Sequence, residues 1–184
     1  TFYINTDGIV VEDVSGNSVR YSGNLLENLT GGEGDDDFVF ADNATLPGTI
    51  NGLTGDDTLD YSAYLTGHEV LLTSFGDQTG FNGEELSLGV GFENIEDIIG
   101  STSVDDSITG MDAITTFTIN ADINLYTSKN TLTTIDHNLT FTNFEYVQGG
   151  GLEDTFNFVA TNPEVLEYLG GAGNDFFVLL GTDT

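Results

Sequence analysis

The chain has 184 residues, of which 31 are acidic and only two are basic, giving a formal net charge of −29. This charge argues against nucleic acids and anionic membranes as partners, because both are bound through basic surfaces. Hydrophobic residues make up 38% of the chain, with 13 Phe and 7 Tyr, so a packed core is expected rather than disorder. A compact body with so much negative charge repels itself, and bound divalent cations would relieve that repulsion.

The sequence contains no cysteine, which excludes disulfides and thiolate metal sites. It shows neither an apolar run of transmembrane length nor a signal peptide, so no insertion into a membrane is expected. The chain opens on Thr1 rather than Met and stops at residues 181–184, in the middle of a repeated pattern. We therefore expect a segment of a longer protein.

Short strands are predicted because apolar and β-branched residues cluster between turn-forming Gly, Asn, Asp and Pro residues. They lie at residues 2–6, 9–14, 18–22, 25–29, 38–41, 49–51, 58–64, 69–73 and 114–119. The glycine-rich residues 76–91 are predicted to form a loop that protrudes from the strands. No segment shows an apolar period near 3.6 over 11 or more residues, so an all-β fold is predicted.

A glycine-rich pattern occurs at five places and is most regular at residues 170–178 and 31–39. It reads G-G-x-G-x-D, then one residue of any type and a large apolar residue. The copies at 52–60 and 149–157 each lack one glycine, and the copy at 100–108 needs one inserted residue. Glycines allow sharp turns with positive φ, and the aspartate places a carboxylate beside exposed carbonyls. Oxygen ligands on a tight turn suit a hard cation such as Ca²⁺.

This pattern resembles the calcium-binding nonapeptide of the RTX (haemolysin-type) repeat family. The resemblance implies a parallel β-solenoid, like a β-helix or β-roll, in which stacked glycine–aspartate turns hold Ca²⁺ between neighbouring coils. RTX nonapeptides run in tandem, whereas the leading glycines here fall at positions 31, 52, 100, 149 and 170, so the resemblance covers five short loops. A spacing of 21 fits one coil, and the loops at 31 and 52 should stack, as should those at 149 and 170. The implied calcium ligands are the carboxylates or the turn backbones of Asp35, Asp36, Asp56, Asp57, Asp154, Asp175, Gly32, Gly34, Gly55, Gly171 and Gly173.

The chain also contains a long internal repeat. An offset of 118 residues aligns Gly31 with Gly149, Asp36 with Asp154, Phe38 with Phe156, Gly52 with Gly170 and Asp57 with Asp175. An offset of 115 aligns residues 1–5 with residues 116–120, which implies a three-residue insertion between the two. We therefore predict a first repeat unit at residues 1–115 and the start of a second, truncated unit at residues 116–184.

No arrangement of residues points to catalysis. The neighbouring carboxylates Asp105 and Asp106 would point to opposite faces of a strand, so they do not form a glycosidase pair. His68 and His137 have no partner at metal-ligand spacing and are predicted to lie at the surface. We expect that the protein is not an enzyme.

The function expected from these features is structural. The chain would be an extracellular repeat module at a bacterial cell surface, part of a stalk, adhesin shaft or filament rigidified by Ca²⁺ between stacked turns. Its partners would be neighbouring repeat units or subunits joined end to end. The alternative is a ligand-binding module on the same scaffold, binding carbohydrate through residues 76–91 or ice through its Thr-x-Thr pairs.

Overall fold

The computed structural model describes residues 1–23 and 26–180. The strands are β1 (Phe2–Asn5), β2 (Gly8–Glu12), β3 (Ser18–Ser22), β4 (Leu29–Gly32), β5 (Asp37–Phe40), β6 (Thr49–Leu53), β7 (Thr58–Asp60), β8 (Glu69–Phe75), β9 (Phe81–Glu84), β10 (Gly91–Ile95), β11 (Asp97–Ile99), β12 (Ser107–Thr109), β13 (Thr115–Ile119), β14 (Asn124–Lys129), β15 (Asp136–Thr142), β16 (Tyr146–Gln148), β17 (Asp154–Phe158), β18 (Glu167–Leu169) and β19 (Phe176–Leu179). The all-β prediction is thereby confirmed. Within the described ranges there is no helix long and apolar enough to cross a membrane.

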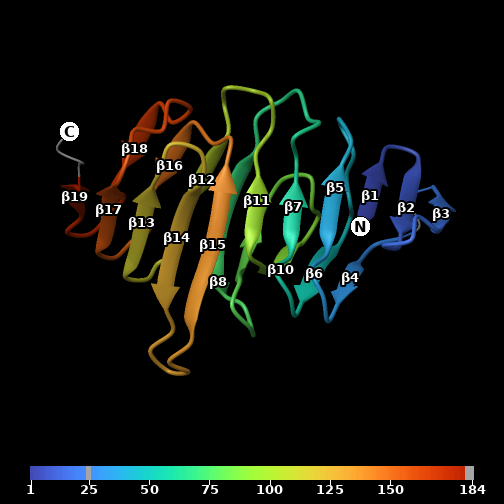
Figure 1. Cartoon of the computed structure of the whole chain (residues 1–184), viewed down its shortest axis with the longest axis horizontal. Helices are drawn as coiled ribbons and strands as arrows, with labels where there is room; N and C mark the ends of the chain where they lie inside the picture. The colour runs from blue at the N-terminus through green and yellow to red at the C-terminus, as the bar shows by residue number, and fades with distance from the viewer. Residues whose placement is uncertain (24–25, 181–184) are drawn as a thin grey trace.

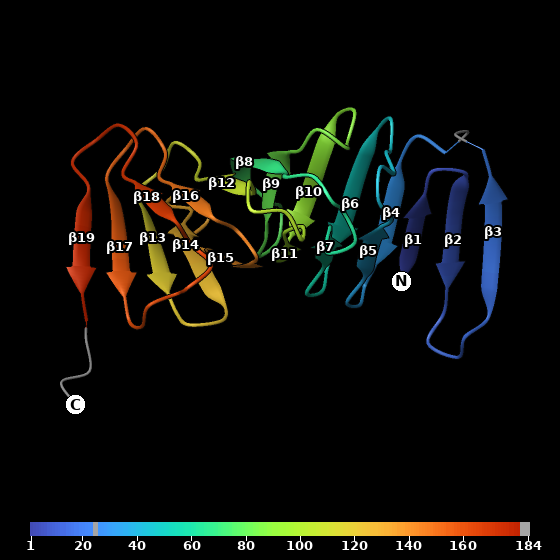
Figure 2. The ribbon, with the colours of Figure 1, turned by 90° about the horizontal axis from the view of Figure 1, so that it is seen from above.

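The strands form two open sheets that run along the length of the molecule (Figures 1 and 2). One sheet has eleven strands in the order β19-β17-β13-β14-β15-β11-β7-β5-β1-β2-β3, and the other has eight in the order β18-β16-β12-β8-β9-β10-β6-β4. From β4 to β8 the chain alternates between the two sheets, with β4 pairing in parallel with β6 and β5 pairing in parallel with β7. The two sheets therefore grow side by side as the chain advances.

The sheets are mixed rather than wholly parallel, so the structure does not show the parallel β-solenoid that was predicted. Antiparallel meanders occur at β1–β2–β3 and β13–β14–β15 in the larger sheet and at β8–β9–β10 in the smaller one. Tight turns produce them, as at Gly8, whose φ of 144° lets β2 reverse directly after β1.

The prediction of a protruding loop at residues 76–91 was wrong. Part of this segment forms β9, which pairs with β8 and β10 inside the smaller sheet. Phe81 is fully buried and holds the segment against the core. Gly83 is required there because a Cβ atom would overlap the Phe92 ring and the Leu71 carbonyl. Gly83 thus serves close packing within the sheet.

The core lies between the two sheets and consists of side chains stacked from strand to strand. Alternate residues of β13 are buried, so that Phe117 and Ile119 point inward. The rings of Phe117 and Phe156 lie 4.6 Å apart and those of Phe156 and Phe177 lie 4.8 Å apart, with interplanar angles of 1° and 5°. These separations match the spacing between hydrogen-bonded strands, about 4.8 Å. The stacks therefore fix the register of neighbouring parallel strands.

The pairing pattern of β1–β7 recurs in β13–β19. The segment β5-β1-β2-β3 of the larger sheet has the same order and strand directions as β17-β13-β14-β15. The parallel pairs β4–β6 and β5–β7 likewise have counterparts in β16–β18 and β17–β19. Phe2 pairs with Phe38 just as Phe117 pairs with Phe156.

Candidate functional site

The aspartates expected to bind calcium lie where turns lead into strands of the larger sheet. Asp36, Asp57 and Asp175 directly precede β5, β7 and β19, and Asp154 is the first residue of β17. The Asp36 N–H donates a hydrogen bond of 2.9 Å to Asp57 Oδ1, and the Asp154 N–H donates one of 3.0 Å to Asp175 Oδ1. The structure thus brings together the turns at 31 and 52, and likewise those at 149 and 170.

The outer acids of the first pair of turns repeat this arrangement closer to solvent. The Asp56 N–H donates a hydrogen bond of 3.0 Å to Asp35 Oδ1, and both residues are exposed. The two turns also contact each other through their backbones, because the Thr54 N–H donates to the Gly32 carbonyl at 3.3 Å. The four acids Asp35, Asp36, Asp56 and Asp57 therefore lie on one edge of the stack.

A positive φ angle explains why glycine occurs at only some of the turn positions. Gly55, Gly171 and Gly173 have φ values of 140°, 85° and 129°. Gly32 and Gly34 do not have positive φ, and no atom lies near the position that a Cβ of Gly34 would occupy. Sequence reasoning about sharp turns therefore applies to three of these five glycines.

The leading glycine of each turn is required for a different reason. A Cβ atom on Gly31 would lie 2.7 Å from Asp36 Oδ2 and 2.6 Å from the Gly52 carbonyl oxygen. A Cβ on Gly52 would overlap the Asp57 carboxylate and the Asn94 carbonyl oxygen in the same way. The carboxylate five residues later thus folds back over its own glycine. Each such turn places a carboxylate oxygen and a carbonyl oxygen around one glycine, which is the chemistry of a hard-cation site.

The row of acids continues beyond the residues that the motif identified. The Asp57 N–H donates a hydrogen bond of 3.0 Å to Glu96 Oε2, so Asp36, Asp57 and Glu96 form one ladder, called here the first acid ladder. Sequence reasoning missed Glu96 because it lies 39 residues after Asp57 and not 21. Glu96 could have been found from the sequence because it is an acid directly ahead of an apolar strand, as Asp36 and Asp57 are.

A second acid ladder runs along the smaller sheet through Asp106 and Glu145. The His68 N–H donates to Asp106 Oδ1 at 2.7 Å, and the Asp106 N–H donates to Glu145 Oε2 at 2.9 Å. Ser101 occupies the leading position of this turn, and its hydroxyl donates to Asp106 Oδ2 at 2.7 Å. The spacing from Ser101 to Asp106 equals that from Gly31 to Asp36, so the inserted residue assumed for this copy is not needed.

Burial makes the central carboxyls of the first acid ladder costly to ionise. Asp57 is fully buried, and its Oδ2 atom has no hydrogen-bond partner among the described residues. Burial, together with the charges of Asp36, Asp35 and Asp56, raises the pKa of Asp57 to about 6. Burial likewise raises the pKa of Glu96 to about 7, and the negative charge of Asp57 adds to the effect. Neutralisation by a proton or a cation would therefore stabilise this ladder.

The second pair of turns has the same electrostatic character. Asp154 is fully buried, and burial raises its pKa, with the charges of Asp175 and Asp112 acting in the same direction. The hydroxyl of Thr115 and the N–H of Gly150 both donate to its carboxylate. Within residues 1–23 and 26–180, no cluster of three or more His, Cys, Asp or Glu side chains is arranged to hold a metal ion by itself. A cation at these turns would need carbonyl oxygens as further ligands.

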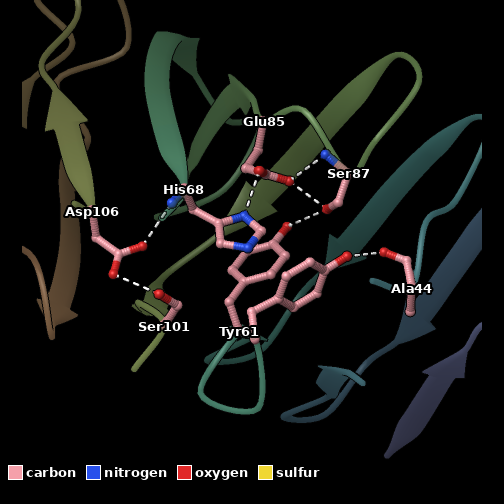
Figure 3. A network of polar contacts seen from close by, with 8 residues as sticks. Ala44, Tyr61, His68, Glu85, Ser87, Ser101 and Asp106 are labelled. Carbon is pink, nitrogen blue, oxygen red and sulfur yellow. Dashed lines mark hydrogen bonds and ion pairs between the residues drawn. The ribbon is translucent and has the colours of Figure 1, made fainter. Parts of the chain in front are cut away.

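The prediction that the two histidines lie at the surface was wrong. His68 is 4% exposed, and its Nδ1 lies 2.6 Å from Glu85 Oε1 (Figure 3). Glu85 in turn accepts hydrogen bonds from the N–H and the hydroxyl of Ser87. Burial by itself would raise the pKa of Glu85, but these bonds from His68 and Ser87 outweigh it and lower the pKa. The rings of Tyr61 and His68 stack at 4.5 Å, which closes the network toward the core.

His137 is also buried, because β15 packs against the β8–β9 hairpin. Its Nδ1 lies 2.8 Å from the Gly80 carbonyl oxygen, and its ring lies 4.6 Å from that of Phe75. In both histidines the Nε2 atom is buried and has no partner in the described part of the chain. Contacts between residues 57 positions apart, such as His137 and Gly80, give no signal in a single sequence.

An open groove of about 820 Å³ lies on the smaller sheet beside β8, β9 and β12. Aliphatic side chains such as Leu71, Leu86 and Val90 line it together with Glu69 and Glu84. Its lining contains no aromatic residue on which a sugar ring would stack.

No family model, curated protein or solved structure matches this chain.

Proposed function

We propose that the chain is an extracellular structural repeat module, part of a stalk, adhesin shaft or filament of a large secreted bacterial protein. The observation that carries this proposal is the first acid ladder, in which buried, stacked carboxylates include an unpartnered Asp57 Oδ2 atom. We take the two alternating sheets to be a β-solenoid whose coils are interrupted by antiparallel hairpins. Ca²⁺ at the stacked turns would stiffen it.

The ladders create a repulsion that the protein itself only partly relieves. Two carboxylates about 5 Å apart repel each other by roughly 3 kcal/mol at an effective dielectric constant of about 20. In the first acid ladder each backbone N–H satisfies one oxygen of the next carboxylate and leaves the charge in place. The chain contains two basic residues, and both of them lie at exposed positions away from the ladders. The missing positive charge must therefore come from solution.

The oxygen atoms at the turns are suitable ligands for Ca²⁺, which would supply the missing positive charge. Asp36 and Asp57, with the carbonyl oxygens of Gly52 and Asn94, would hold an ion at the first pair of turns. Asp154 and Asp175, with the Gly170 carbonyl oxygen, would do so at the second. A bound ion supplies positive charge that turns the mutual repulsion of the carboxylates into attraction. Modules that bind Ca²⁺ in the millimolar range occur outside cells.

The recurrence of one strand pattern supports a mechanical role. If residues 1–115 and 116–184 are units of one repeat, each unit lengthens the same two sheets and leaves their direction unchanged. Contacts between the β8–β9 hairpin and β14 or β15 join the two units, as in the aromatic pair Phe81 and Tyr126 at 5.0 Å. A continuous core of this kind resists bending, which is what a shaft requires.

A calcium titration tests the proposal. We expect millimolar CaCl₂ to raise the melting temperature and to reduce the hydrodynamic radius relative to EDTA, with MgCl₂ at equal ionic strength doing less. A concentration 100-fold above the Kd would stabilise the fold by about 3 kcal/mol per site. Asp57→Asn should remove much of this gain, whereas Asp122→Asn, at an exposed position outside the ladders, should retain it. Equal melting temperatures and radii in EDTA, Mg²⁺ and Ca²⁺ would refute the calcium role.

A carbohydrate-binding module has less support than a shaft. Part of segment 76–91 forms β9 within the smaller sheet, and the adjacent groove lacks aromatic residues. A glycan array would detect such binding directly.

A further inference from the structure

The larger sheet carries an uncovered apolar face at the N-terminal end of the molecule. There it extends beyond β5 by three strands, whereas the smaller sheet ends at β4 (Figure 2). Every residue of β3 is exposed, including Val19 at 56% and Tyr21 at 47%. These two side chains pair with Val11 and Ile9 of β2 and so continue the inward, core-forming row of the sheet. We call the inward side of β2 and β3, with the free edge of β4, the N-terminal face.

The corresponding face of the second meander is covered. Val11 pairs with Val19 as Tyr126 pairs with Leu139, and Ile9 pairs with Tyr21 as Asn124 pairs with Phe141. Leu139 and Phe141 are the counterparts of Val19 and Tyr21, and both are fully buried.

Two strands and one hairpin of the preceding segment provide that cover. The edge of β15 pairs in parallel with β11, and the edge of β16, the counterpart of β4, pairs in parallel with β12. The β8–β9 hairpin packs on the inward side, where Phe81 contacts the Tyr126 ring and Gly80 contacts His137. Residues 69–109 thus cover, on the second meander, the face that is uncovered on β1–β4.

We propose that the N-terminal face binds the end of another unit of this type, one that ends in strands like β11 and β12. The β11-like strand would pair in parallel with β3, and the β12-like strand would pair in parallel with β4. A β8–β9-like hairpin of that unit would cover Val19 and Tyr21. This inference rests on the proposed function, because it treats residues 1–115 and 116–184 as units of one repeat.

Charge complementarity supports this occupant. At the internal joint the Thr140 hydroxyl donates a hydrogen bond of 2.5 Å to Asp97 Oδ1 of β11. The counterpart of Thr140 on β3 is Arg20, since Val10 pairs with Arg20 as Leu125 pairs with Thr140. Arg20 is half-exposed and is paired with Asp7 at 2.6 Å. One of the two basic residues of this acidic chain therefore lies where the incoming unit would present the carboxylate equivalent to Asp97.

The β11 and β12 strands of a second copy of the same 184-residue chain cannot pair with this face. Its β11 lies between β7 and β15, and its β12 lies between β8 and β16, so both edges of each strand are already paired. The partner must present β11-like and β12-like strands with free edges. Concentrating the 184-residue chain should therefore leave the N-terminal face exposed.

The test is a tandem chain in which a copy of residues 1–115 precedes residues 1–184. The protein has no cysteine, so Val19→Cys in the second copy provides a single reporter thiol. We expect its reaction with a disulfide reagent to be at least about 100-fold slower in the tandem chain than in the 184-residue chain. Val14→Cys, in the fully exposed turn beside it, should react equally fast in both.

A charge exchange then tests the pairing itself. Arg20→Glu in the second copy should restore much of the thiol reactivity, and adding Asp97→Lys in the preceding unit should reduce it again. Equal reactivity of the Val19→Cys thiol in both chains would overturn the proposal. So would protection that appears on concentrating the 184-residue chain, since that would show pairing with a second copy.

Measurements in EDTA and in Ca²⁺ separate this proposal from the calcium role. Thiol protection without any effect of Ca²⁺ would support docking at the N-terminal face and refute the calcium role. Stiffening by Ca²⁺ without thiol protection would support the calcium role and refute docking.

Discussion

At the scale of single residues, the acid and the glycine five positions ahead of it act as one unit. The carboxylate of Asp57 lies over the Gly52 Cα, and that of Asp36 lies over Gly31. At Gly31 and Gly52 a Cβ would overlap this carboxylate, whereas in the Asp106 turn the equivalent position holds Ser101, whose hydroxyl donates to the acid. The spacing of five residues between the glycine and the acid thus reflects close packing of the carboxylate against the glycine.

Substituting these glycines tests that reading. Gly52→Ala should lower the free energy of unfolding by about 2–4 kcal/mol, because its Cβ would overlap the Asp57 carboxylate and a carbonyl. Gly34→Ala is the matched control, since its Cβ would enter open space without positive φ, and it should change stability by less than about 0.5 kcal/mol. Urea denaturation of both variants measures the difference. Equal losses would show that chain flexibility matters and not the packing.

At the scale of elements, a buried polar contact joins the start of β8 to the end of β9 in the β8–β9–β10 meander. Glu85 follows β9 directly and reaches His68, which precedes β8. Both side chains are almost fully buried, so each depends on the other for hydrogen bonding. The exposed neighbour Glu84 makes no such contact with His68.

Breaking this contact should destabilise the fold. Glu85→Ala leaves the His68 ring nitrogen buried without its partner and should cost about 3 kcal/mol. Glu84→Ala, one position earlier on the exposed side of β9, should cost less than about 0.5 kcal/mol. Thermal unfolding followed by circular dichroism distinguishes the two. If both variants melt together, the buried network does not support the meander.

At the scale of the whole molecule, negative charge dominates the dependence of stability on pH. The pKa values of Asp57 and Glu96, raised to about 6 and about 7, exceed those of ordinary carboxyls in an unfolded chain. Such acids bind protons more tightly in the folded state, so the free energy of unfolding falls as the pH rises from about 4, the ordinary carboxyl pKa, to about 7. The formal charge of −29 acts in the same direction through self-repulsion.

We therefore expect greater stability in calcium-free buffer near pH 5.5 than near pH 8, by on the order of 2 kcal/mol. Urea denaturation across this range measures the slope. Glu96→Gln, which keeps an oxygen to accept the Asp57 N–H, should flatten the profile, and Glu153→Gln at an exposed turn should leave it unchanged. A profile that rises toward pH 8 would contradict this account.

Features that depend on local pattern could be predicted from the sequence alone. Alternation of apolar residues specified strands, and the spacing of 21 between Gly31 and Gly52 placed Asp36 beside Asp57, as the hydrogen bond between them shows. Such features are readable because the residues involved lie within one turn or one coil of the chain.

Contacts between distant segments could not be predicted in this way and are seen in the folded structure. Glu96 joins the ladder of Asp57 across 39 residues because the β8–β10 meander lies between them, and no short motif records an insertion of that length. His68 and His137 were predicted to lie at the surface, but Glu85 and the Gly80 carbonyl, at the two ends of β9, pair with their buried Nδ1 atoms. Burial and pairing of this kind depend on how the strands are ordered in the two sheets, and that order is a property of the packed core as a whole.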